Sequence, residues 1–233
     1  MTMMNNEFGK IISLHEAVQF IEDGCSLMVG GFGGIGSPPS LIEAILNKEV
    51  KNITLICNDT GFPHIGVGRL VSSRRVKKAI VSHIGSNPVA GKLMHDGKLE
   101  VEFSPQGVLV ERIRAGGVGL GGILVDIGVD NEWVTKGKQV IEVDGMRYLL
   151  ELPLTADVSI VYAKKGDPFG NLIYDKSARN TNPSVAMAGH ITIAEVEEIV
   201  PLGELNPEEI ITPGIFINYI VQSEGVNWKW AWE

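Results

Sequence analysis

Apolar residues recur along the chain in short groups whose spacing alternates between the helical and the strand period. Ser13 to Glu16 has the composition of a capping box, and apolar residues at helical spacing follow it. Pro38 and Pro39 precede a second such group, which predicts a helix that begins near them. Largely apolar runs predict buried strands at 27–29, 53–57, 78–82, 157–163 and 191–196.

The middle of the chain has a different pattern. Residues 99–103 alternate apolar and acidic side chains, which predicts a strand exposed on one face. Ser104 and Pro105 suit the N-cap and first position of a helix that ends at Gly116 and Gly117. Two further apolar stretches, 139–143 and 146–151, are joined by Asp-Gly and predict a hairpin.

Strands that alternate with helices favour an α/β fold, with a mainly parallel sheet covered by helices on both faces. The hairpin is then a small elaboration of that sheet. No linker marks a boundary, so we expect a single domain over 1–233, with a core at about 10–221 and a tail at 222–233. Ligands of such sheets bind at the carboxyl ends of the strands.

Charge and composition exclude several classes of protein. The net charge of -8 argues against a nucleic-acid partner, which requires a basic surface. No apolar run approaches the roughly 20 residues of a membrane span, and the polar N-terminus lacks a signal peptide, so we expect a cytoplasmic protein. Cys25 and Cys57 lie in apolar runs without zinc-type spacing, so we expect buried thiols and no metal site.

The sharpest local feature is a glycine-rich loop between a predicted strand and a predicted helix. Gly31, Gly33 and Gly36 satisfy the G-x-G-x-x-G pattern, and Asp59 ends the next strand. One interpretation is a nicotinamide-dependent oxidoreductase with Asp59 on a ribose, and another is a nucleotide-binding module. The same loop also suits coenzyme A, or merely a tight strand-to-helix turn.

The wider segment from Asp23 to Pro38 resembles the first signature of family I coenzyme A transferases, which combines an Asp-Gly turn, Gly-Gly-Phe and Gly-x-Pro. The resemblance extends from about residue 10 to 221. Its further matching segments are 55–60, 82–88, 104–107, 111–117, 176–180 and 212–214.

The resemblance implies an α subunit that moves coenzyme A between short-chain carboxylates such as acetate, butyrate and acetoacetate. No cofactor is bound permanently, since coenzyme A is itself the substrate. In this family a glutamate of the partner β subunit carries it as a thioester, within a Ser-Glu-Asn-Gly motif absent here. Gln222 to Gly225 comes close, but we expect Glu224 to be a tail residue. The complex is expected to be α2β2 or larger.

The resemblance also assigns site residues. Gln106 matches an oxyanion-hole glutamine, although helix capping explains it too. Asn58 matches an asparagine near the substrate carboxylate, or else is a strand-end turn residue. The loop is expected to bind coenzyme A or substrate through Gly30, Gly31, Phe32, Gly33, Gly34, Ile35 and Gly36.

Other residues are expected to have structural roles. Arg112 and Arg114 are expected on a solvated or interface face of their helix. The stretch 123–131 departs from the threonine-rich loop of the relatives, which makes the acyl specificity open. Trp228, Trp230 and Trp232 are expected to pack on the body or at a subunit contact.

Overall fold

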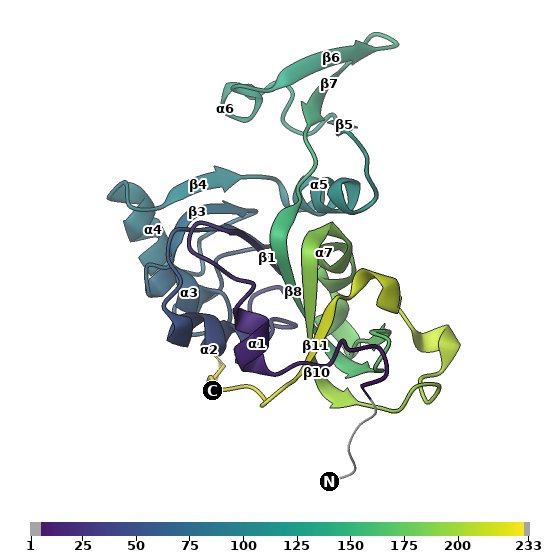
Figure 1. Cartoon of the computed structure of the whole chain (residues 1–233). Helices are drawn as coiled ribbons and strands as arrows, with labels where there is room; N and C mark the ends of the chain where they lie inside the picture. The colour runs from purple at the N-terminus through teal and green to yellow at the C-terminus, as the bar shows by residue number, and fades with distance from the viewer. Residues whose placement is uncertain (1–5, 231–233) are drawn as a thin grey trace.

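A computed structural model describes residues 6–230 of the chain. A large, mainly parallel sheet forms the body, and a small antiparallel sheet projects from one side of it (Figure 1). Both ends of the described chain lie on the side of the body away from the small sheet (Figure 1).

Among the described residues the large sheet has eight strands. Its order is β11 (Tyr219–Gln222), β10 (Gly189–Ile199), β8 (Ala156–Gly166), β1 (Ser26–Val29), β2 (Ile53–Ile56), β3 (Val76–Val81) and β4 (Glu100–Phe103). All neighbours on this path are parallel, and only β9 (Leu172–Ile173) runs antiparallel, against β8. At the centre, Leu27 of β1 lies opposite Leu55 of β2 and Val158 of β8. The predicted mainly parallel sheet is confirmed.

Helices cover both faces of this sheet, as predicted. One apolar cluster contains Ala17, Leu41, Leu70 and Leu93 and packs one face under four helices. These are α1 (Leu14–Val18), α2 (Pro39–Lys48), α3 (Gly68–Ser72) and α4 (Pro88–His95). The opposite face packs under α5 (Gln106–Gly117) and α7 (Asn182–Ala188). Short 3-10 turns occur at Lys176–Arg179, Pro207–Glu209 and Gly214–Phe216.

Local signals set some helix starts but not all of them. Ser13 and Glu16 form the predicted capping box, with the Glu16 N–H donating to Ser13 Oγ at 3.2 Å. Helix α2 begins at Pro39, also as predicted. The prediction that Ser104 is the N-cap of the next helix was wrong, because α5 begins at Gln106 with Pro105 as its N-cap. The buried Ser104 Oγ has no hydrogen-bond partner among the described residues.

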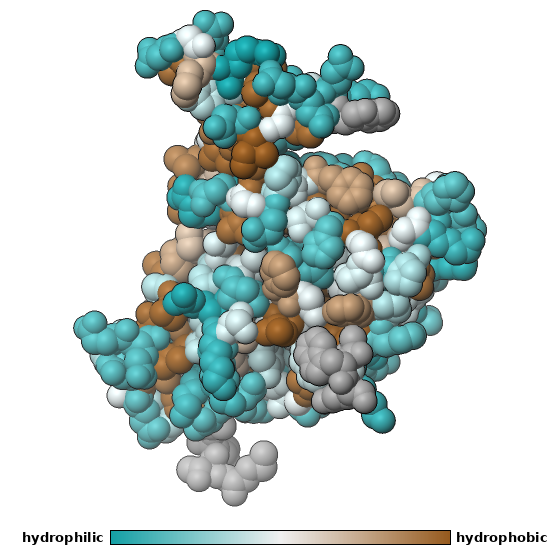
Figure 2. Space-filling view, turned by 180° about the vertical axis from the view of Figure 1, so that it is seen from behind, coloured by the Kyte–Doolittle hydropathy of each residue, from teal (hydrophilic) through white to brown (hydrophobic). Residues whose placement is uncertain are grey.

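The predicted hairpin is confirmed as β6 (Gln139–Val143) and β7 (Met146–Glu151). Asp144 and Gly145 both have positive φ, at 50° and 76°, as a tight hairpin turn requires. A third strand, β5 (Ile123–Val125), pairs with β7, and α6 (Glu132–Thr135) precedes β6; neither was predicted. Figure 2 shows hydrophobic side chains gathered where this small sheet meets the body.

None of the helices within residues 6–230 is both long and apolar enough to cross a lipid bilayer.

Candidate functional site

The predicted site residues all follow strands of the large sheet at its carboxyl edge. The glycine loop follows β1, Asn58 follows β2, and Gln106 begins the helix after β4. Since β1 and β2 are neighbours, the loop and Asn58 lie side by side. Gln106 lies three strand positions from β1, roughly 14 Å along the edge at the usual strand spacing. The structure therefore places them on one edge but not in one cluster.

The glycine loop folds into a tight turn that exposes two apolar side chains. Phe32 and Ile35 form an antiparallel bridge, with N–H to O distances of 2.9 and 3.0 Å. Phe32 remains 48% exposed and Ile35 37% exposed. The apolar side chains thus face outward, while the backbone groups of the turn bond to each other.

The side chain of Asp59 fixes this loop by accepting backbone hydrogen bonds. Its carboxylate accepts the N–H of Gly33 at 2.9 Å and the N–H of Gly61 at 2.8 Å. The side-chain amide of Asn58 donates to the same carboxylate at 2.8 Å. Asp59 is only 3% exposed, so these donors replace the water that its charge would otherwise need. Asp59 is therefore a clamp between the loop after β1 and the loop after β2.

Glu195 of β10 occupies the N-terminus of α2. Its carboxylate accepts the Ser40 N–H at 3.1 Å, the Leu41 N–H at 2.9 Å and the Ser40 hydroxyl at 2.7 Å. The Ser223 hydroxyl donates to it as well, at 2.5 Å. Burial raises the pKa of Glu195, and these hydrogen bonds oppose the rise. The first N–H groups of α2 are therefore already bonded to a side chain inside the protein.

These two carboxylates count against the nucleotide interpretations. A dinucleotide loop needs free N–H groups at the loop and at the helix start, where the pyrophosphate binds. Here Asp59 takes the Gly33 N–H and Glu195 takes the first N–H groups of α2. Asp59 is also buried, so it does not face a ribose. The nicotinamide oxidoreductase alternative is not supported.

Gln106 is the exposed first residue of α5, and its side chain has no hydrogen-bond partner among the described residues. The N-cap is Pro105, so the alternative explanation of Gln106 as a helix-capping residue does not hold. Its amide is free to donate to a ligand at the carboxyl edge.

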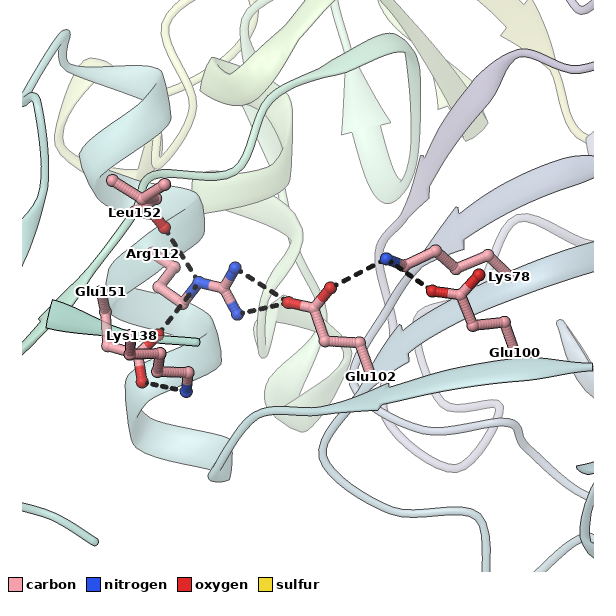
Figure 3. A network of polar contacts seen from close by, with 7 residues as sticks. All are labelled: Lys78, Glu100, Glu102, Arg112, Lys138, Glu151 and Leu152. Atoms are coloured by element: carbon pink, nitrogen blue, oxygen red, sulfur yellow. Dashed lines mark hydrogen bonds and ion pairs between the residues drawn. The ribbon is translucent and has the colours of Figure 1, made fainter. Parts of the chain in front are cut away.

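A network of ion pairs fixes the helix that carries Gln106 (Figure 3). Arg112 lies on α5, two turns after Gln106, and donates from both Nη atoms to Glu102 Oε1 at 3.1 Å. Its Nε donates to the Leu152 carbonyl oxygen at 2.9 Å. Glu102 also pairs with Lys78 at 3.1 Å. Of the two predicted positions for Arg112, a solvated or an interface face, the solvated one was wrong: Arg112 is 7% exposed and joins β4 to the small sheet.

Arg114, by contrast, is exposed and pairs with Glu111 at 2.8 Å, as expected for a surface charge. Cys25 and Cys57 are free, and Cys25 is only partly buried. Burial raises the pKa of Cys57 well above its usual value, which keeps it a thiol. No group of three or more His, Cys, Asp or Glu residues in the described chain is arranged to hold a metal ion.

The tail and the divergent stretch lie in different places. Residues 123–131 form β5 and the following turn, in the small sheet. The exposed Glu224 donates its N–H to Ser40 Oγ at 2.9 Å, beside the start of α2. Trp228 and Trp230 pack edge to face, and Trp230 lies next to Gly34. Trp232 lies outside the described residues.

Sequence reasoning missed Glu195 and the clamp role of Asp59. No local motif marks Glu195, because its partner helix lies about 155 positions earlier in the chain. A signal did exist for the second loop: residues 61–66 repeat the Gly-Phe-x-x-Ile-Gly pattern of residues 31–36.

The family model described as Coenzyme A transferase matches residues 11–223. The probable coenzyme A transferase subunit alpha of Bacillus subtilis is 60% identical over 226 residues, covering 97% of this chain and 99% of that protein. The acetate CoA-transferase subunit alpha of Escherichia coli is 48% identical, covering 92% and 97%. The Clostridium acetobutylicum acetoacetyl-CoA:acetate/butyrate CoA transferase alpha subunit is also 48% identical, covering 91% and 97%.

Solved structures agree. An acyl-CoA transferase from E. coli O157:H7, determined as a thioester complex with CoA, has a TM-score of 0.84 and 26% identity; the match covers 93% of this chain and 48% of that chain. This chain thus spans about half of that protein. Glutaconate coenzyme A-transferase from Acidaminococcus fermentans shares the fold, with a TM-score of 0.78 and 20% identity over 91% of this chain and 75% of that chain.

A family model spans most of the chain, and named alpha subunits of nearly equal length align over more than nine-tenths of it. The chain therefore belongs to the coenzyme A transferase family, as an alpha-type subunit.

Proposed function

We propose that the chain, together with a β subunit, transfers coenzyme A between an acyl-CoA and a short-chain carboxylate. Acetate, butyrate and acetoacetate are the proposed acids, because relatives at 48% identity carry these names. Coenzyme A enters as substrate, and no other cofactor is required.

The free amide of Gln106 is the observation that carries this proposal. In acyl transfer, negative charge develops on the carbonyl oxygen of the thioester as the nucleophile adds. A preorganised N–H donor stabilises that charge, and removing one such donor lowers the rate by about 100- to 1000-fold. Gln106 offers this donor at the edge where ligands of parallel sheets bind.

The nucleophile is proposed to come from the partner chain. Asp59 and Glu195, the carboxylates buried next to the glycine loop, are both occupied by internal hydrogen bonds. A partner glutamate would attack the thioester carbonyl and expel coenzyme A as thiolate, giving a mixed anhydride. The thiolate would then attack the glutamyl carbonyl, which releases the first acid and leaves a glutamyl-CoA thioester. The second acid reverses these steps.

The acyl-CoA transferase from E. coli O157:H7 is about twice as long as this chain, which matches only about half of it. This supports a partner chain of similar size that supplies the other half. An α2β2 or larger assembly in the cytoplasm is proposed on the same grounds as the transfer itself.

The test is transfer from acetoacetyl-CoA to acetate or butyrate, by this chain alone and mixed with its β partner. We expect activity only in the mixture, and a loss of about 100-fold in kcat for Gln106→Ala. Gln139→Ala is the matched control, because Gln139 is an exposed glutamine of the small sheet. Activity in the chain alone would contradict the proposal and make the exposed Glu224 the nucleophile to replace next.

A further inference from the structure

The two loops that Asp59 joins have the same fold. Residues 31–36 and 61–66 share the pattern Gly-Phe-x-x-Ile-Gly, and each forms a bridge between its Phe and its Ile. The first and last glycines of both have positive φ. The turns follow neighbouring strands β1 and β2, so they lie side by side. We call residues 31–36 and 61–66 together the twin-turn platform.

The turns of the platform touch each other. A Cβ on Gly34 would lie 2.4 Å from Ile65 Cγ2, and a Cβ on Gly66 would lie 3.3 Å from Gly34 Cα. Ile65 is 2% exposed, whereas Phe32 and Ile35 are largely exposed. The platform is therefore one packed surface with apolar side chains on top.

Most backbone donors of the first turn are used inside the protein. The Gly31 N–H donates to Thr181 Oγ1 at 3.3 Å, and the Gly33 N–H donates to Asp59. Further N–H groups between Gly30 and Ser37 that donate internally are those of Gly30, Phe32, Ile35 and Ser37. With Glu195 at the start of α2, a phosphate would find few free donors and buried carboxylates nearby.

Two side-chain oxygen atoms next to the Asp59 clamp remain unpaired within residues 6–230. Asn58 Oδ1 and Thr60 Oγ1 are buried and have no hydrogen-bond partner among the described residues. An amide oxygen can only accept, so Asn58 lacks an N–H donor and not an anion. Both atoms lie beneath the outer surface of the platform. The surface itself is apolar and offers few free backbone N–H groups, which suits an uncharged chain better than a phosphate.

We infer that the twin-turn platform binds the pantetheine arm of coenzyme A, and that the phosphates of coenzyme A lie off it. This inference rests on the proposed transfer function and refines it. Along the edge, Gln106 is roughly 10 Å from the turn after β2 and roughly 14 Å from the turn after β1, distances that an extended arm can bridge. Gln106 then meets the reacting carbonyl, while Phe32 packs on the arm.

A ladder of shortened substrates tests this with the assembled enzyme. The acetoacetyl thioesters of coenzyme A, pantetheine and N-acetylcysteamine lose first the phosphates and nucleotide, and then most of the arm. We expect Phe32→Ala to lower kcat/KM about tenfold for the first two thioesters, and less than twofold for the third. Ile35→Ala should give the same pattern. Phe103→Ala is the matched control, since Phe103 is 50% exposed on the same edge, at the end of β4.

Each other pattern overturns the inference. A loss confined to the coenzyme A thioester would place the phosphates on the platform. An equal loss with all three thioesters would place the acyl group there, or show that Phe32 serves assembly with the β subunit. Failure of the proposed function is separate, because it appears as absent transfer with wild-type enzyme and acetoacetyl-CoA.

Discussion

Glu102 Oε1 lies 3.1 Å from both Nη1 and Nη2 of Arg112, so one carboxylate oxygen joins β4 to α5 across the turn between them (Figure 3). Gln106 lies between these two residues in the sequence, at the end of that turn. The pair also reaches the small sheet, since Arg112 Nε donates to Leu152 O and lies 3.8 Å from Glu151 Oε2. The orientation of α5, and with it Gln106, depends on this pair.

We expect Glu102→Gln to lower the free energy of unfolding by about 2 kcal/mol, because it leaves the buried Arg112 guanidinium poorly paired. The value lies below the range for fully buried pairs, since the Glu102 side chain is 35% exposed. Urea unfolding monitored by circular dichroism measures it. Glu100→Gln is the control on the same strand: that side chain is 63% exposed, shares Lys78, and should cost less than about 0.5 kcal/mol. Equal effects of the two variants would rule out a special role for the Arg112 pair.

The same pair gives the stability a pH dependence. Burial alone would raise the pKa of Glu102, but hydrogen bonds and charges from Lys78 and Arg112 outweigh it and lower the pKa. A carboxyl whose pKa is lower in the folded state stabilises the fold above its unfolded pKa, about 4.3. We therefore expect the stability difference between wild type and Glu102→Gln to be constant near neutral pH. It should shrink as the pH falls through the folded pKa, in urea titrations across the acid range; a difference that grows toward acid pH would contradict this.

Gly34→Ala should destabilise the protein by about 1–3 kcal/mol. Gly34 has a φ of +95°, and an added Cβ would lie 2.4 Å from Ile65 Cγ2 and 3.3 Å from Trp230 Cζ3. Gly107 offers the opposite case within α5, because nothing lies within 4 Å of its added Cβ. Gly107→Ala should stabilise by about 0.5–1 kcal/mol through its helix propensity. Thermal unfolding of both variants checks the sign as well as the size.

Glu195→Gln should cost about 2–3 kcal/mol of stability. One amide oxygen cannot replace two carboxylate oxygens that accept from Ser40, Leu41 and Ser223, so a buried N–H of α2 loses its partner. Ser13→Ala is the control for an exposed helix cap, with an expected loss of about 1 kcal/mol. If the Glu195 variant lost no more than the Ser13 variant, the buried cap would not matter to stability.

Local features were predictable, and contacts between distant segments were not. The capping box of Ser13, the start of α2 at Pro39 and the Asp144-Gly145 turn each depend on a few adjacent residues, and the sequence showed them. The Ser104 cap failed because Pro105 takes the N-cap position itself. Strands β5 and β11 were missed because they are short and gain their stability from partners elsewhere in the chain.

In the candidate site, too, local features were predictable and contacts between distant segments were not. The glycine loop was identified from its own pattern and Gln106 by resemblance, and the structure places them on one edge. Whether they act in transfer stays a prediction. Asp59 could not be interpreted correctly from sequence, because a carboxylate after a strand suits a ribose contact as well as a backbone clamp. Only the positions of Gly33 and Gly61 separate these two roles.

The central strand β1 completes its pairing late in synthesis. Ser26 of β1 bonds to Asp157 at the start of β8, which is 131 positions further along the chain. Strands β1 to β4 thus leave the ribosome with one edge of β1 open, and such an edge can pair with other chains. In refolding followed by pulsed hydrogen exchange, the Gly30 amide, bonded to Ile160 of β8, should gain protection after the Thr54 amide, bonded to Cys25. Among the described strands, β1, which carries the glycine loop, is therefore the one separated by the longest stretch of sequence from a neighbour that it needs.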